Sequence, residues 1–87
     1  MNSSWLSRAD AACEIIRTAN YIESAAFRRI PALPGSVLVE IRSQLLDAKN
    51  PEGTQARYQG IMTIHALQRL RTAIDAALQL SDREAQQ

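Results

Sequence analysis

Few side chains in this sequence belong to the types that usually carry catalysis. His65 is the only histidine and Cys13 the only cysteine among 87 residues. We expect His65 to lie at the surface beside Arg69, because the sequence fixes no second acid or base near it. We expect Cys13 to be a buried, inert thiol, since no basic neighbour favours its thiolate form. The chain is therefore predicted not to be an enzyme, and no catalytic residue is assigned.

Metal and cofactor sites are also not indicated by the sequence. One cysteine and one histidine cannot supply the usual ligand sets for zinc. The glycines Gly35, Gly53 and Gly60 are isolated from one another, so they form no phosphate-binding loop. We predict no metal, no cofactor and no small-molecule substrate.

The charge pattern argues against nucleic acid and membranes as partners. The chain has ten basic and nine acidic residues, and no basic run exceeds Arg28-Arg29. Proteins that bind phosphate backbones usually carry a concentrated basic surface. No apolar run approaches the roughly 20 residues that cross a bilayer, and the first residues lack the pattern of a signal peptide. We therefore expect a protein of the reducing cytoplasm whose partner is another protein.

Apolar residues recur at helical spacing in three segments, and we recognise no alternation typical of strands. The first segment spans about 4–30 and should end before Pro31. A linker, "IPALPG", separates it from a second helix over about 36–49, and a third helix spans about 54–80. The fold class is predicted to be all-α, with the last two helices forming an antiparallel hairpin. The chain is expected to be a single helical domain, 1–87, with a frayed polar tail at 81–87.

The third predicted helix is apolar on nearly every side. At 1.5 Å per residue it would be about 40 Å long and its hairpin partner about 20 Å, so its C-terminal half would project. Exposed apolar surface of this kind usually marks an interface. The predicted partner-contact residues are Tyr58, Ile61, Met62 and Ile64. In the alternative, the first segment covers this surface and the chain is a compact three-helix monomer.

Residues 45–71 resemble the helical hairpin of small phage-encoded proteins, in which an "A-x-x-P-E" turn precedes "R-x-Q-G" and "A-L-x-x-L". The matching positions are Ala48, Pro51, Glu52, Arg57, Gln59, Gly60, Ala66, Leu67 and Leu70. The same span is similar to the hairpin of the small chaperones that guard type III secretion needle subunits, although Gly53 and Thr54 depart from the compact form of that turn. Residues 1–35 carry no resemblance.

The phage resemblance implies a non-enzymatic structural or assembly protein that acts through helix–helix interfaces with copies of itself or with a larger protein. Its place would be the bacterial cytoplasm or an assembled virion. The chaperone resemblance implies the alternative, a cytoplasmic adaptor, chaperone or inhibitor that masks a helical protein partner.

Overall fold

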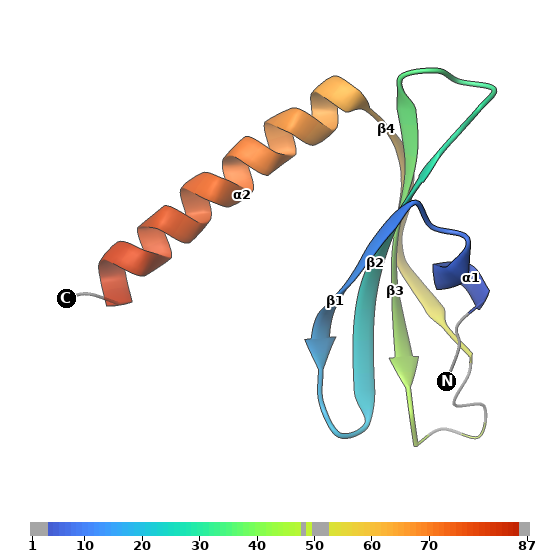
Figure 1. The fold of residues 1–87 in the computed structure, drawn as a ribbon. Helices are drawn as coiled ribbons and strands as arrows, with labels where there is room; N and C mark the ends of the chain where they lie inside the picture. Colours follow the sequence, from blue (N-terminus) through green and yellow to red (C-terminus); the bar gives the residue numbers. More distant parts are fainter. Residues whose placement is uncertain (1–3, 48, 50–52, 86–87) are drawn as a thin grey trace.

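The computed structural model describes residues 4–47, 49 and 53–85 and shows a sheet of four strands followed by one long helix (Figure 1). A short helix, α1 (Ser4–Ser7), precedes the sheet. The strands are β1 (Ala11–Arg17), β2 (Tyr21–Arg29), β3 (Ser36–Leu45) and β4 (Gln55–Thr63), and the long helix is α2 (Ile64–Ala85). The strands pair antiparallel in chain order, β1-β2-β3-β4. The prediction of an all-α chain is therefore wrong.

Two of the three predicted helices are replaced by strands. The segment predicted as a helix over 4–30 holds α1, β1 and β2, and the segment over 36–49 holds β3. The third prediction, over 54–80, is wrong in its first half, which is β4, and right in its second half, which is α2. The predicted turn residues Ala48, Asn50, Pro51 and Glu52 lie outside the described residues.

The alternation along β3 explains why this segment is a strand. Val37, Val39 and Ile41 are β-branched and point to one side of the sheet, because successive side chains of a strand alternate. Leu38 and Glu40 between them, and Arg42 after them, point to the other side. Leu38 and Ile41 are three residues apart and would share one side of a helix, but in the strand they lie on opposite faces of the sheet.

Short turns connect the strands where the sequence supplies suitable residues. Between β1 and β2, the amide of Thr18 donates to the carbonyl of Tyr21 at 2.8 Å. The predicted linker at 30–35 is confirmed as the connection from β2 to β3. Gly35 has a φ of 82°, a left-handed conformation that glycine adopts without steric cost.

The pairing register divides the strand residues between two faces, which we name after the helix nearest to each. On the α1 face, Glu14 pairs with Ser24 and Ser24 with Arg42. On the α2 face, two successive rows cross the sheet. They are Cys13–Ala25–Ile41–Tyr58 and Ala11–Phe27–Val39–Gly60. The α2 face is therefore the more apolar of the two.

Very little of the described chain is fully buried. The buried apolar residues are Ile22, Ala25, Ala26 and Val39, and no large side chain is completely enclosed. The helical periodicity of the sequence predicts Leu45, Leu70 and Ile74 as core residues, but they are 54%, 43% and 50% exposed. A single copy thus consists of a sheet and a long helix without a closed hydrophobic core between them.

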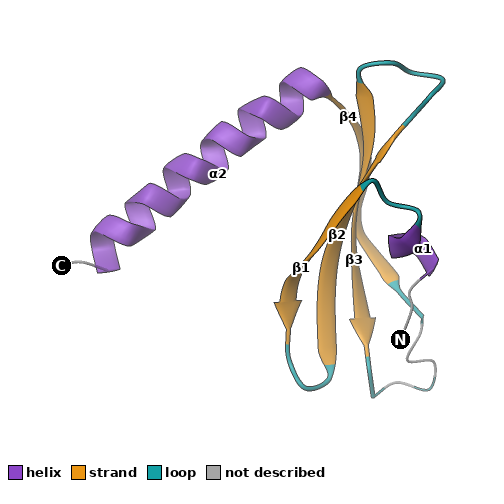
Figure 2. Cartoon of the chain, in the orientation of Figure 1, coloured by secondary structure: helices purple, strands orange, loops and turns teal. Residues whose placement is uncertain are grey.

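Helix α2 leaves the sheet directly from β4 and projects away from it (Figure 2). No residue separates Thr63, the last of β4, from Ile64, the first of α2. The amide of Ala66 donates to Thr63 Oγ1 at 3.1 Å, which caps the helix. The amide of Ile64 donates to the carbonyl of Gly35 at 2.9 Å. These two bonds fix the direction in which the helix departs.

Candidate functional site

The four predicted contact residues do not share one helix surface. Tyr58 and Met62 lie on the α2 face of β4, Ile61 lies on the α1 face, and Ile64 begins α2. Tyr58, Ile61 and Ile64 are 42%, 57% and 47% exposed. Their role in partner binding stays a prediction, but the fold separates them between two faces and a helix.

One apolar surface is the α2 face of the sheet. Its central residues are Phe27, Val37, Val39, Ile41 and Met62, of which only Val39 is fully buried. The ring of Tyr58 leans along β4 over Gly60: a Cβ on Gly60 would lie 2.6 Å from Tyr58 Oη. Helical spacing predicts Gly60 as a close contact between two helices, but here Gly60 provides space for an aromatic ring.

A second apolar surface runs along α2. Leu67, Leu70, Ile74 and Leu78 are spaced three, four and four residues apart, so they form one stripe on the helix. We call this set the α2 stripe. Leu70, Ile74 and Leu78 are all more than two-fifths exposed. Beyond β4, from which it continues, α2 has only sparse contact with the strands.

The α2 stripe and the α2 face border an open groove of about 390 Å³. Phe27 and Val37 line it from the sheet, and Leu67, Leu70 and Ile74 line it from the helix. Asp10, Arg29 and Arg71 complete the lining, and the amide of Arg29 donates to Asp10 Oδ2 at 2.7 Å. The groove is therefore apolar at its centre, with charge at its margin. Such a lining suits an apolar side chain or helix more than a polar metabolite.

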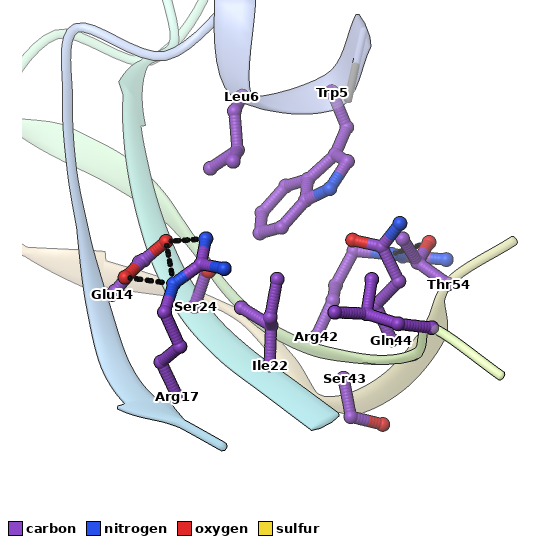
Figure 3. Close-up of a pocket in the computed structure, with 11 residues that line it drawn as sticks. Trp5, Leu6, Glu14, Arg17, Ile22, Ser24, Arg42, Ser43, Gln44 and Thr54 are labelled. Atoms are coloured by element: carbon purple, nitrogen blue, oxygen red, sulfur yellow. Dashed lines mark hydrogen bonds and ion pairs between the residues drawn. The ribbon is translucent and has the colours of Figure 1, made fainter. Parts of the chain in front are cut away.

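The opposite, α1 face carries a smaller and more polar pocket of about 220 Å³ (Figure 3). Trp5 and Leu6 reach down from α1 toward Ile22, while Glu14 and Arg17 lie at one side of the pocket. At the other side, Arg42 lies 5.9 Å from the centre of the Trp5 ring, within the range of a cation–π contact. This contact holds α1 on the sheet.

Both arginines of the α1-face pocket have carboxylate partners. Arg17 forms a hydrogen-bonded ion pair with Glu14. That hydrogen bond lowers the pKa of Glu14 and raises the pKa of Arg17 from their ordinary values. Arg42 donates to Thr54 Oγ1 at 2.7 Å and pairs with Glu40 at 3.4 Å. Because their charge is compensated inside the protein, these arginines form a structural network and not an anion site.

The two side chains singled out for catalysis lie at the surface. His65 is exposed in the first turn of α2, so the expectation of a surface position is confirmed, although the helix begins later than predicted. Cys13 is exposed on the α2 face of β1, so the expectation of a buried thiol is wrong. Within the described ranges, no three His, Cys, Asp or Glu residues are grouped closely enough to hold a metal ion. Neither helix of the described chain has the length and apolar character needed to cross a bilayer.

Sequence reasoning missed the sheet side of the groove. Phe27 and Val37 were placed on helices, although the β-branched residues Val37, Val39 and Ile41 recur at every second position, which is a signal for a half-buried strand. The α2 stripe, in contrast, is recognisable from its spacing in the sequence.

Comparisons of the chain with protein-family models, curated proteins and solved structures gave no match.

Proposed function

We propose that this chain is a non-catalytic structural or assembly protein that works by protein–protein contact through its α2 face and α2 stripe. The observation that carries the proposal is the long helix α2, which projects from the sheet with its apolar stripe uncovered. Apolar patches of this extent usually mark an interaction site.

The thin core supports the same proposal. A chain of 87 residues has little apolar surface to bury, and here the buried apolar residues of the sheet include two alanines. Small domains of this kind often need a disulfide, a metal or a partner for stability. A single cysteine excludes an internal disulfide, so a partner is the support that fits the exposed surfaces best.

The resemblance of residues 45–71 to phage-encoded proteins stays a prediction. It was a resemblance to helical hairpins, and this span contains β4 and the start of α2. The hairpin itself is thus excluded, and helix–helix docking is replaced by contacts of a sheet face and a helix. A virion or assembly component of the bacterial cytoplasm remains the setting that we propose.

Light scattering coupled to size-exclusion chromatography tests the proposal on three proteins: the parent, Ile74→Asp and Thr72→Asp. Ile74 lies in the α2 stripe, whereas Thr72 lies on the opposite side of the same helix and serves as the control. The parent and Thr72→Asp should form an assembly of fixed stoichiometry, and Ile74→Asp should lose it. If the parent and Thr72→Asp also stay monomeric at high concentration, self-assembly is contradicted.

The open groove favours a second candidate function, that of an adaptor or chaperone for a helical protein. Its apolar lining over about 390 Å³ has room for side chains of a foreign amphipathic helix. In that case the parent would be a monomer that binds a specific host protein. Binding would be lost in Ile74→Asp and kept in Thr72→Asp.

A further inference from the structure

The two uncovered apolar surfaces belong to the same chain, and in one copy they border the same groove without closing it. Helix α2 begins at the residue after β4, and the bonds made by Ile64 and Ala66 fix its departure. Helix α2 already turns back from the end of β4 but diverges from the sheet (Figure 1), and closing the groove within one chain would need connecting residues at this point. The sequence provides none between Thr63 and Ile64. The stripe is therefore left open for another molecule to cover.

We propose that this molecule is a second copy of the chain, and that the two copies exchange helices. In this dimer the α2 stripe of each copy packs on the α2 face of the other. The inference rests on the proposed function, because it names the partner of the same two surfaces. A two-fold axis makes both contacts identical. The stripe and the face of each copy are then both covered, and neither surface stays exposed in the dimer.

The dimensions of the two surfaces agree. Helix α2 has 22 residues, which gives a length of about 33 Å at 1.5 Å per residue. Strand β3 has 10 residues, which gives about 33 Å at 3.3 Å per residue. The helix can therefore cover the sheet along its whole length.

The area left exposed by one copy is close to what such a dimer needs. The chain exposes 6778 Å², whereas a compact monomer of its mass would expose about 5,100 Å². Its radius of gyration is 15.4 Å, against about 12 Å for a compact domain of this length. The excess of roughly 1,700 Å² per copy corresponds to the interfaces of obligate homodimers, which bury about 2,000–5,000 Å² in total.

The free edge of β1 is a poorer site for a second copy than the sheet face. The register of β1 against β2 shifts between Glu14 and Ile16, so Ile15 forms a bulge. Glu14 and Arg17 place an ion pair beside this bulge. Bulges and charges at an edge hinder the addition of another strand. The β1 edge is thus a less favourable surface for association than the sheet face and the helix.

Complementation between two defective variants tests the exchange. Ile74→Asp damages only the stripe, and Tyr58→Asp damages only the α2 face, at an exposed position of an edge strand. Each variant alone should raise the dimer dissociation constant about thirtyfold or more, as the loss of a central anchor does. In an equimolar mixture the two variants should form a heterodimer, because one intact stripe can pack on one intact face. Sedimentation velocity with one variant fluorescently labelled measures this heterodimer directly.

The controls are Thr72→Asp, on the polar side of α2, and Gln59→Asp, on the α1 face of β4. Both should dimerise like the parent, and circular dichroism should show that all four variants keep their secondary structure. A mixture that dimerises no better than either variant alone would overturn the exchange in favour of stripe-to-stripe pairing, and the proposed function would survive. A normal dimer of Tyr58→Asp would also overturn it. If neither variant changes association with any protein, the proposed function itself fails.

Discussion

At the scale of single residues, Arg42 connects more of the structure than any other charged side chain that we describe on the α1 face. It donates to Thr54 near the start of β4, pairs with Glu40 on its own strand, and lies against the ring of Trp5. The side chains of Arg42 and Glu40 are only 24% and 21% exposed. Charge-assisted bonds in such surroundings are stronger than those at an open surface.

Replacement of Arg42 by Met should loosen α1 from the sheet. The variant keeps an apolar stem but leaves the carboxylate of Glu40 without its partner, so the free energy of unfolding should fall by about 1–2 kcal/mol. Trp5 is the only tryptophan, and its fluorescence should shift to longer wavelength as water reaches the ring. Arg69→Met, at an exposed position of α2, is the matched control. An unchanged emission spectrum of Arg42→Met would show that the cation does not hold α1.

The ion pair of Glu14 and Arg17 makes a pH-dependent contribution. The hydrogen bond from Arg17 lowers the pKa of Glu14 in the folded chain. A carboxyl group with a lowered folded-state pKa contributes stability above its unfolded pKa and loses it as the pH falls through the folded value. Both groups are exposed, so the effect should be small.

In chemical denaturation, the free energy of unfolding should therefore be slightly higher for the parent than for Glu14→Gln at neutral pH. This difference should disappear in acid. Nuclear magnetic resonance of the Glu14 carboxyl gives its titration directly, and Arg17→Gln should raise the pKa of Glu14 toward its ordinary value. A pKa that is the same in the parent and in Arg17→Gln would contradict the pairing.

At the scale of elements, the junction between β4 and α2 determines where the helix can go. An insertion of four Gly and Ser residues between Thr63 and Ile64 should allow the helix to close onto its own sheet. The stripe would then cover the α2 face within one chain, because an intramolecular contact has a high effective concentration. Light scattering should show a monomer with undiminished helix content. The same insertion in the loop at 30–35 is the control and should leave the dimer intact.

The elements also show how far the sequence could predict this fold. Helix α2 is recognisable because Leu67, Leu70, Ile74 and Leu78 keep helical spacing, and the loop at 30–35 is recognisable from its prolines and Gly35. The strands were missed because Ala11, Ala12, Ala25 and Ala26 are strong helix formers, whose preference is overridden here by pairing with neighbouring strands. The alternation in β3 was a usable signal, since Val37, Val39 and Ile41 are separated by Leu38 and Glu40.

The candidate site was only partly predictable for a similar reason. Its helix side follows from local spacing, but its sheet side depends on the register that places Phe27 beside Val39 across two strands. Register is a property of pairing between distant segments, and a single sequence specifies it weakly where both faces carry mixed residues. Tyr58 and Met62 were recognised as surplus apolar residues, but their common face became visible only with the register.

At the scale of the whole molecule, the flat sheet and its projecting helix resemble one half of a dimer more than a complete domain. The chain measures 43 × 42 × 17 Å along its principal axes, which leaves most apolar side chains near the surface. Folding and association should therefore be coupled, as in obligate dimers, and the midpoint of thermal unfolding should rise with protein concentration.

The most direct test of the exchanged dimer is an isotope-filtered nuclear Overhauser experiment on a mixture of labelled and unlabelled chains. It detects only contacts between protons of different copies. We predict contacts from the methyl groups of Ile74 and Leu78 of one copy to the rings of Phe27 and Tyr58 of the other. Contacts between the α2 stripes alone, or a monomer without any contact between copies, would contradict the account.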